Sequence, residues 1–178
     1  MVGLPDLNTC DDLTRLLKGL RDQEGGRSCV NVVRLLSSDQ QGVVAGMASY
    51  IASNPEHGTT EVGYVAHGAR MARSPAATET HYLLARQALE INGYRRLEWK
   101  CDSNNLKSGH AALRYGYTFE GCFRQHRVTA RGTNRDTNWY SMLDKEWPNP
   151  KKLLASWLDP ANFDGQGIQR KKLKEFRE

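Results

Sequence analysis

Several features that assign proteins to particular classes are missing from these 178 residues. No apolar run approaches the roughly 20 residues that a membrane-spanning helix needs. The N-terminal stretch MVGLPDLNTCDD has neither the basic start nor the hydrophobic centre of a secretory leader. Internal repeats and low-complexity segments are also lacking. We therefore expect a cytoplasmic protein without a membrane partner. We also expect one folding unit, because a single core at this length can bury about two thirds of the unfolded chain's surface.

Cysteine is scarce, with four residues at positions 10, 29, 101 and 122. These positions are too far apart for the C-x-x-C spacing of zinc and redox sites, and the five histidines do not share metal-ligand spacing. No metal is therefore expected. Cys101 and Cys122 lie in strand-like runs and are expected to be buried thiols, whereas each histidine is expected to be a polar surface residue.

Positive charge is concentrated in the second half of the chain. Residues 1–89 carry 8 basic and 9 acidic groups, whereas residues 90–178 carry 17 and 11, within a net charge of +5. A basic half can serve a phosphate-bearing cofactor or another polyanion, and a solvated basic face without a partner is the alternative. Nucleic acid is not an expected partner, because no recognised binding motif or aromatic-basic surface pattern accompanies these charges.

Periodicity predicts a helix, three strands, a helix, a strand, a helix and two strands, followed by a short helix. The predicted helices are 9–20, 74–92, 104–115 and one after Trp147-Pro148, and the predicted strands are 29–36, 43–52, 60–67, 95–102, 117–123 and 137–144. Because a crossover helix joins strand 60–67 to strand 95–102, these two should be parallel within an otherwise antiparallel sheet. The stretch 124–136 is expected to be a basic loop, and the final RKKLKEFRE a charged tail.

Two of these elements are defined in detail. In helix 74–92, Ser74 suits the N-cap and Pro75 suits the first helical position, where its missing N–H costs nothing. The face of this helix expected to be apolar carries Ala77, Leu84, Ala88 and Ile91. The strand 95–102 alternates with a period of two. Its two sides are Leu97, Trp99 and Cys101 on one and Arg96, Glu98 and Lys100 on the other.

The stretch ARMARSPAATE, residues 69–79, joins a predicted strand to a predicted helix. It contains no glycine, unlike most phosphate-binding loops, yet a helix N-terminus offers unpaired backbone N–H groups and the positive end of the helix dipole. The amides of Ala76 and Ala77 are available there, and Arg70 and Arg73 can each grip phosphate oxygens with two N–H groups. On these residues alone, an anion site and a bare helix start are both open.

A longer motif follows in CDSNNLKSGHAALRYGYTFEG, which fits the pattern N-x-x-S-x-x-A-A-x-x-x-G-F with tyrosine for phenylalanine. The matching positions are Asn105, Ser108, Ala111, Ala112 and Gly116-Tyr117. The segments GMASY, PEHG, EVGYV, AATE, YRRLEWKCD, FEGCFRQH, NRDTNWYSMLDKEWP and NFD extend the agreement. Over roughly residues 28–165 the sequence resembles the GNAT N-acetyltransferases, and within them the subgroup similar to the Rim-type ribosomal-protein N-terminal alanine acetyltransferases.

The resemblance implies an α/β (α+β) fold with a mixed, mostly antiparallel GNAT-like sheet and flanking helices. Its parallel strands, 60–67 and 95–101, would splay apart so that acetyl-CoA wedges between them. Residues 1–148 would form one GNAT-like acetyltransferase domain, and residues 149–178 a C-terminal helix and basic tail. The implied cofactor-binding residues are Tyr64, Val65 and Ala66 beside the pantetheine, Arg70, Arg73, Ser74, Pro75, Ala76 and Ala77 around the pyrophosphate, and Asn105 on the pantetheine arm.

The implied activity is transfer of acetyl from acetyl-CoA to a primary amine, a protein N-terminus or a small amine, by direct attack on the thioester. Because an amine is mostly protonated at neutral pH, a base must accept a proton, and an acid helps the thiolate leave. Glu61 stands at the family's usual position for the base, with an exposed strand carboxylate paired with an arginine as the alternative. Ala112 replaces the family's common tyrosine acid, so Ser108 is the candidate acid, or else only a hydrogen bonder. His67 and His126 could line the acceptor pocket.

The sequence departs from the family pattern in two places. Ala72 stands where the common cofactor motif has glutamine or arginine. The family also begins with a strand and a longer helical region that help form the acceptor pocket, and about 40 to 50 residues of this region are expected to be missing. The sheet would then have an uncovered edge beside strand 29–36, open to a homodimer partner. A catalytically impaired GNAT-like protein that binds CoA or another partner is the alternative to an active enzyme.

Overall fold

The computed structural model describes residues 11, 14–15, 18–19, 28–36, 42–71 and 74–177. Its strands are β1 Cys29–Leu35, β2 Val43–Asn54, β3 Thr59–His67, β4 Arg96–Asp102, β5 Thr118–Val128 and β6 Asn134–Leu143. Its helices are α2 Pro75–Arg86, α3 Leu106–Tyr115 and α4 Pro148–Leu158, with a π-helical turn η1 at Gln87–Ile91 and 3-10 turns η2 at Pro160–Asn162 and η3 at Leu173–Phe176. Most of the predicted helix 9–20 lies outside the described residues. Within the described ranges, no helix is long and apolar enough to cross a membrane.

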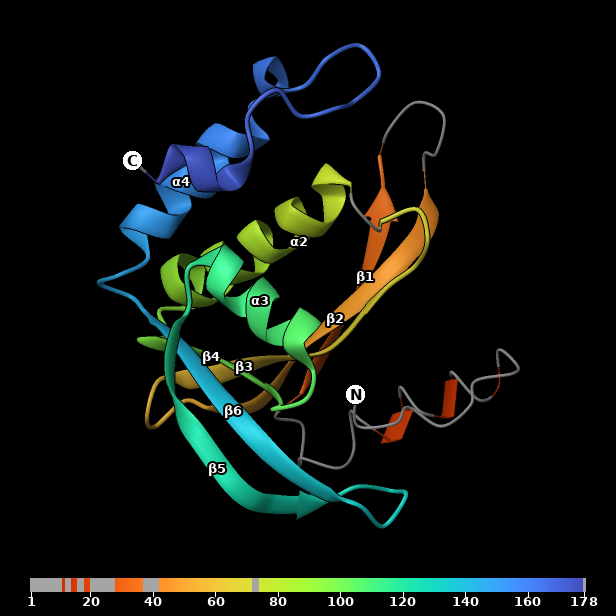
Figure 1. Ribbon diagram of the computed structural model, residues 1–178, viewed down its shortest axis with the longest axis vertical. Coiled ribbons are helices and arrows are strands. Elements are labelled where there is room, and N and C mark those ends of the chain that lie inside the picture. Colours follow the sequence, from red (N-terminus) through yellow and green to blue (C-terminus); the bar gives the residue numbers. More distant parts are fainter. Residues whose placement is uncertain are drawn as a thin grey trace.

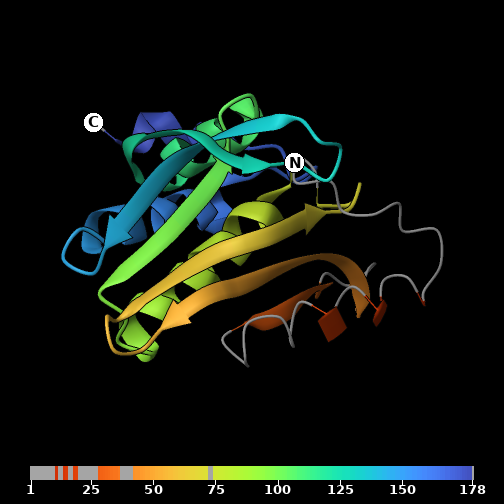
Figure 2. The same cartoon turned by 90° about the horizontal axis from the view of Figure 1, so that it is seen from below.

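The described strands form one sheet in the order β1-β2-β3-β4-β6-β5. Neighbouring strands are antiparallel except β3 and β4, which the crossover through α2 makes parallel. The helices α2, α3 and α4 lie together on one face of the sheet (Figure 1 and Figure 2), here called the helix face. This mixed sheet with flanking helices confirms the predicted fold class.

The hydrophobic core lies between the helix face and these helices. Leu97, Trp99 and Cys101 are buried in it, so the predicted alternation of β4 is confirmed. Leu84 of α2 and Leu154 of α4 belong to the same cluster. Because full burial of one such side chain stabilises a fold by about 1.5–3 kcal/mol, this single cluster holds the helices on the sheet.

The predicted helix 74–92 forms, but its last turn changes the expected face. Between Gln87 and Ile91 the helix widens into a π-turn, closed by the Asn92 N–H donating to the Gln87 carbonyl at 2.9 Å. An extra residue in one turn rotates the side chains that follow. Ile91 is therefore 61% exposed, and the prediction that it faces the core is wrong, whereas Leu89 is buried.

The β5–β6 hairpin is longer than predicted. Most of the expected basic loop 124–136 continues the two strands, and the turn is confined to residues 129–133, where the Thr129 N–H donates to the Thr133 carbonyl at 2.8 Å. The arginines of this stretch lie mostly on the two strands, with Arg124 and Arg127 on β5 and Arg135 on β6. Cys122 lies on β5 at the edge of the described sheet and is exposed, so the prediction that it is buried is wrong.

The C-terminal residues after α4 also pack on the domain instead of ending as a charged tail. Leu173, in η3, is only 4% exposed and joins the main core cluster. Upstream, the buried side chain of Asn162 accepts a hydrogen bond from the Lys171 N–H and donates to the Trp157 and Lys171 carbonyls. The segment 159–177, here called the C-terminal segment, is thereby fixed beside α3 and α4.

Candidate active site

The two parallel strands separate at a defined point. β3 and β4 pair only through Thr59 with Arg96, Thr60 with Leu97 and Glu61 with Glu98. Beyond Glu61, β3 continues to His67 and β4 to Asp102 along diverging directions, seen in Figure 2 as the yellow and green strands. The predicted splay is thus present, and it exposes strand backbone that a bound molecule can pair with.

A β-bulge lies on β3 just beyond this point. Ser49 of β2 pairs with Gly63 and Met47 pairs with Ala66, so Tyr64 and Val65 together oppose one β2 residue. Tyr64 has φ of 48°, a conformation that side-chain-bearing residues seldom adopt. Bulges re-aim the backbone next to binding sites. The bulge therefore fits the predicted pantetheine contact with Tyr64, Val65 and Ala66, which stays a prediction.

The loop into α2 has the predicted layout with one difference. Ser74 is the N-cap in an extended conformation and Pro75 is the first helical residue, but Ser74 Oγ donates to the Met71 carbonyl at 2.9 Å and does not cap the helix. The first-turn amides, including those of Ala76 and Ala77, therefore receive no bond from the cap side chain. This is the arrangement that an anion at a helix N-terminus needs.

The same loop is anchored by one buried methionine. Met71 has no solvent exposure, and a Cβ added at Gly46 would lie 2.5 Å from its sulfur and 2.7 Å from the Ala66 carbonyl oxygen. Glycine at position 46 thus leaves the space in which Met71 sits. Arg70 beside it is exposed, as a phosphate-binding arginine must be, whereas Arg73 lies outside the described residues.

Glu61, the candidate base, lies where the two strands part. Its side chain is 11% exposed, and Oε2 accepts a bond from Lys100 Nζ at 2.8 Å. Burial raises the pKa of Glu61 above its ordinary value, and Lys100 partly opposes this effect. The alternative interpretation, an exposed carboxylate paired with an arginine, is wrong, since the group is buried and its partner is a lysine.

Glu61 belongs to a row of alternating charges across three strands, on the face opposite the helices. Lys100 also bonds Glu98 Oε2 at 2.7 Å, and Arg96 bonds Glu98 Oε1 at 2.8 Å. Arg96 then forms a bidentate pair with Glu120 of β5 and, with help from Ser141, lowers the pKa of Glu120 to about 2. Glu98 and Glu120 are thus each held between two donors. Lys100, itself fixed on Glu98, is the one donor shown for Glu61 and sets where that carboxylate points.

Ser108, the candidate acid, lies on the helix face. The Asn105 side chain caps α3 by accepting from the Ser108 N–H at 3.2 Å. The Ser108 hydroxyl oxygen accepts from Trp99 Nε1 at 3.0 Å and lies within hydrogen-bonding reach of the Cys101 sulfur. Trp99 therefore orients the hydroxyl, so its own proton is left to be donated.

Aromatic and cationic side chains of the hairpin continue the face that carries Glu61. The Trp139 ring lies 3.9 Å from Lys100 Nζ and 4.7 Å from the Phe123 ring centroid. His126 contacts the same two rings, and its Nδ1 and the Trp139 Nε1 are buried without a hydrogen-bond partner among the described residues. His67 lies apart from them, exposed at the end of β3. This cluster lies where an acceptor could approach Glu61.

Beyond the effect of burial, two arginines lie close enough to His126 of that cluster to lower its pKa. Arg127 and Arg135 are directly opposite each other on β5 and β6. Like charges in this position repel, so the pair is unfavourable without an anion nearby. Arg127 is also close enough to Glu61 to lower its pKa, which places the arginine in the field of the candidate base.

Sequence reasoning missed two residues near the site. Lys100 was recognised as facing away from the core but not as the partner of Glu61, because the register of β3 on β4 sets that contact. His81 was expected at the surface, yet it is 4% exposed and stacked on Tyr115 at 4.2 Å. The spacing of His81 with Leu84 of α2 and Ala88 of η1 was the available signal.

Comparison with known proteins agrees with this geometry. A family model described as an acetyltransferase (GNAT) domain matches residues 4–118. No curated protein matches significantly. Among solved structures, a GCN5-related N-acetyltransferase from Brucella melitensis is 39% identical, with a TM-score of 0.87 over 96% of this chain and 74% of the other.

Two further structures are similar at different levels of identity. A probable GNAT-family acetyltransferase from Chromobacterium violaceum is 39% identical, with a TM-score of 0.71 over 79% of this chain and 68% of the other. The Microcin C7 self-immunity acetyltransferase MccE, in complex with acetyl-CoA and AMP, is 23% identical, with a TM-score of 0.62 over 78% of this chain and 73% of the other. At 23% identity, the similarity to MccE shows only that the two proteins share a fold.

Proposed function

This chain belongs to the GNAT acetyltransferase family, and from that premise we propose that it transfers acetyl from acetyl-CoA to a primary amine by direct attack. The observation that carries the proposal is the position of Glu61. A buried carboxylate with a raised pKa lies where β3 and β4 part, at the inner end of the space between them. A base at that point reaches an acceptor held at the thioester.

The residues around this space fit acetyl-CoA. The bulged backbone of Tyr64, Val65 and Ala66 pairs with the pantetheine, and Asn105 contacts the same arm. The loop that holds the pyrophosphate comprises Arg70, Arg73, Ser74, Pro75, Ala76 and Ala77. Helix-start amides and guanidinium groups are the donors that phosphates bind most strongly.

Proton transfer is divided between the two faces of the sheet, with Glu61 of β3 on one and Ser108 of α3 on the other. The bound cosubstrate supplies a thioester carbon for the amine to attack and a sulfur that can leave. Glu61 accepts the proton of the attacking amine, directly or through one water, while the nitrogen–carbon bond forms and the carbon–sulfur bond breaks. The Ser108 hydroxyl, oriented by Trp99, acts as the acid toward the leaving sulfur.

The acceptor is an amine attached to an uncharged or acidic group, as at a protein N-terminus. Arg127 and Arg135 lie near His126 of the aromatic cluster with Trp139 and Phe123, and these two cations repel polycationic amines. Among small amines, those with a carboxylate fit best. Membership of the Rim-type subgroup and a cytoplasmic location remain predictions in accord with such a substrate.

Calorimetric titration with acetyl-CoA, followed by thiol-release assays, tests the proposal. Neutral and acidic N-terminal peptides should be acetylated, and spermidine should be a poorer acceptor. Absence of cofactor binding at millimolar concentration would overturn the proposal. Binding without turnover on any amine of the panel would support the alternative, a catalytically impaired CoA-binding protein.

A homodimer through the edge of the sheet is a separate prediction. β1 is an edge strand of the described sheet and pairs there with β2. An edge strand can pair with a second copy. Sedimentation over a range of concentrations should show a dimer, and a monomer at every concentration would contradict it.

A further inference from the structure

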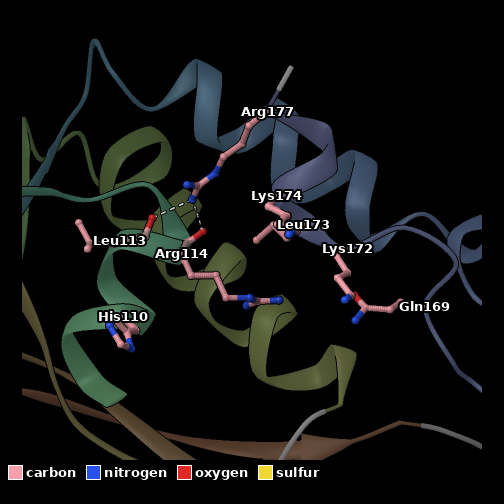
Figure 3. A pocket seen from close by; sticks show the side chains of 8 residues that line it. All are labelled: His110, Leu113, Arg114, Gln169, Lys172, Leu173, Lys174 and Arg177. Carbon is pink, nitrogen blue, oxygen red and sulfur yellow. Dashed lines mark hydrogen bonds between the residues drawn. The ribbon is translucent and has the colours of Figure 1, made fainter. Parts of the chain in front are cut away.

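A cavity of about 450 Å³ lies between α3 and the C-terminal segment, away from Glu61. Its cationic lining residues are Arg114, Lys172, Lys174 and Arg177. Figure 3 shows these side chains, from two parts of the chain, around one opening. The lining contains no aspartate or glutamate. The volume lies in the range of about 300–1,000 Å³ found for small-molecule sites, so the cavity suits a single ligand and not a nucleic-acid duplex.

The walls of the cavity are fixed relative to each other, because hydrogen bonds hold the C-terminal segment against α3. Arg177 donates to the Leu113 carbonyl at 2.8 Å and to the Arg114 carbonyl at 3.0 Å, drawn as dashed lines in Figure 3. A cation on the last carbonyls of a helix is favourable for the helix dipole. Leu173 anchors the neighbouring turn in the core. Lys172 and Lys174 are therefore presented on a fixed backbone.

The charges of the cavity are arranged for an anion. Within the described residues, no carboxylate lies at ion-pair distance from Lys172 or Lys174. The guanidinium of Arg114 is fixed, because it donates to Thr78 Oγ1 at 2.9 Å and lies 5.2 Å from the Trp157 ring centroid. Gathering these cations in a lining that contains no carboxylate is unfavourable unless an anion joins them.

Arg114 also links the cavity to the start of α2. Its partner Thr78 is the fourth residue of that helix, three residues from Pro75. At 1.5 Å of rise per residue, the guanidinium lies about 5 Å along the helix from the loop proposed for the pyrophosphate. In CoA, the 3′-phosphate and the pyrophosphate are attached to the same ribose. A pyrophosphate at the loop thus brings the 3′-phosphate to the mouth of the cavity.

We propose that this cavity receives the 3′-phosphorylated adenosine end of CoA, with the 3′-phosphate bound by Lys172, Lys174 and Arg114. The inference rests on the proposed function for the position of the pyrophosphate. It makes the C-terminal segment part of the cofactor site. It also accounts for the basic end of the sequence, which the reaction itself does not use.

Calorimetric titration of the full chain with CoA and with 3′-dephospho-CoA tests the inference without relying on turnover. The native chain should bind CoA about 10- to 100-fold more tightly, the range expected for charge-assisted bonds to one phosphate. The double variant Lys172→Ala/Lys174→Ala should lower this ratio toward one, with Arg114 as the remaining phosphate ligand, and leave the affinity for 3′-dephospho-CoA unchanged. The matched control Lys145→Ala/Lys152→Ala removes two exposed lysines outside the cavity and should keep the native ratio. Thermal melts should show both double variants folded.

The outcomes separate this inference from the proposed function. Equal affinity of the native chain for both ligands, or an unchanged ratio in the Lys172/Lys174 variant, would overturn the inference alone. Failure of both ligands to bind would overturn the proposed function and this inference together. Adenosine 3′,5′-bisphosphate should compete with CoA, and its binding without competition would assign the cavity to a free phosphorylated ligand and overturn the inference.

Discussion

At the scale of single residues, the chemistry depends on Glu61. Replacing it with glutamine keeps the shape of the side chain and its contact with Lys100 but removes the basic site. Turnover should fall by about 100- to 10,000-fold, the usual contribution of a general base, while acetyl-CoA affinity stays the same. Glu98→Gln is the matched control, because it removes another carboxylate from the same lysine. Equal losses in the two variants would indicate that the charge row matters and that Glu61 is not the base.

The pH dependence of turnover follows from the raised pKa of Glu61. A base works only when deprotonated, so kcat/KM should fall as the pH drops through that pKa. Because burial raises the pKa of Glu61, this fall in kcat/KM, the acid limb of the pH profile, should lie above pH 4.5, the ordinary pKa of a glutamate. The limb should disappear from the residual activity of Glu61→Gln. A limb that persists unchanged in the variant would belong to another group.

His81 should make the fold sensitive to acid. Burial, with smaller effects from Arg114 and His67, lowers its pKa from 6.5 to about 3, so the unfolded chain binds a proton more readily than the folded chain between these values. Stability therefore falls as the pH drops through that window. From pH 7 to pH 5 this one residue should remove about 2 kcal/mol from the free energy of unfolding.

The variant His81→Phe isolates that effect. Phenylalanine keeps an aromatic ring for the stack on Tyr115 and removes a buried nitrogen that has no hydrogen-bond partner among the described residues. Urea unfolding at pH 7 and pH 5 should show an acid loss about 2 kcal/mol smaller than in the native chain. The exposed control His57→Ala should behave like the native chain. An identical acid loss in His81→Phe would mean that His81 is protonated in the folded state.

At the scale of elements, the loop into α2 depends on the close approach of β2 to Met71. A Cβ at position 46 would meet both the Met71 sulfur and the Ala66 carbonyl, so Gly46→Ala forces β2 and β3 apart. We expect a loss of about 1–3 kcal/mol in stability, as for other overpacked sites. Acetyl-CoA affinity should also fall, because Ala66 belongs to the proposed cofactor strand. Calorimetry and urea unfolding check both, and Gly165→Ala, which meets no atom within 4 Å, should change neither.

The helices and strands could be predicted from sequence wherever the residues within the element determine its type and its ends. The alternation of β4, the Pro75 start of α2 and the glycine end of α3 are all local signals, and each is where it was expected. The π-turn that exposes Ile91 was not predicted, because the local pattern of Leu84, Ala88 and Ile91 fits a continuous α-helix. The length of the β5–β6 hairpin was not predicted, because an arginine-rich stretch has the composition of a loop. Only the pairing of the two strands in the structure shows that it is extended.

The candidate site, too, was predicted only in part. The positions of Glu61 and Ser108 could be assigned from the family pattern, which fixes them within a strand and a helix. Their partners, Lys100 and Trp99, come from strand register and from helix packing, so only the structure shows them. The cationic cavity joins residues 110–114 to residues 169–177, and no local pattern connects two such distant stretches.

At the scale of the whole molecule, cationic groups are found on both sides of the gap between β3 and β4, with different predicted roles. On the helix side they belong to α3 and the C-terminal segment, where they suit a phosphate. On the opposite side Arg127 and Arg135 lie near His126 of the aromatic cluster beside Glu61. The first set would hold the cosubstrate and the second would select the acceptor, so mutations in the two sets should affect different kinetic constants.

The acceptor prediction can be tested by charge reversal at Arg127. In Arg127→Glu, the ratio of kcat/KM for spermidine to that for an acidic N-terminal peptide should rise by about tenfold or more at low salt, and the rise should shrink as salt increases. Using a ratio cancels any change in the chemical step, which matters because Arg127 also acts on the pKa of Glu61. Arg124→Glu is the matched control on the same strand, since Arg124 acts on Asp136 and does not appear among the groups that shift Glu61. An equal rise in both variants would reflect net charge alone, and no rise in Arg127→Glu would remove the hairpin from acceptor selection.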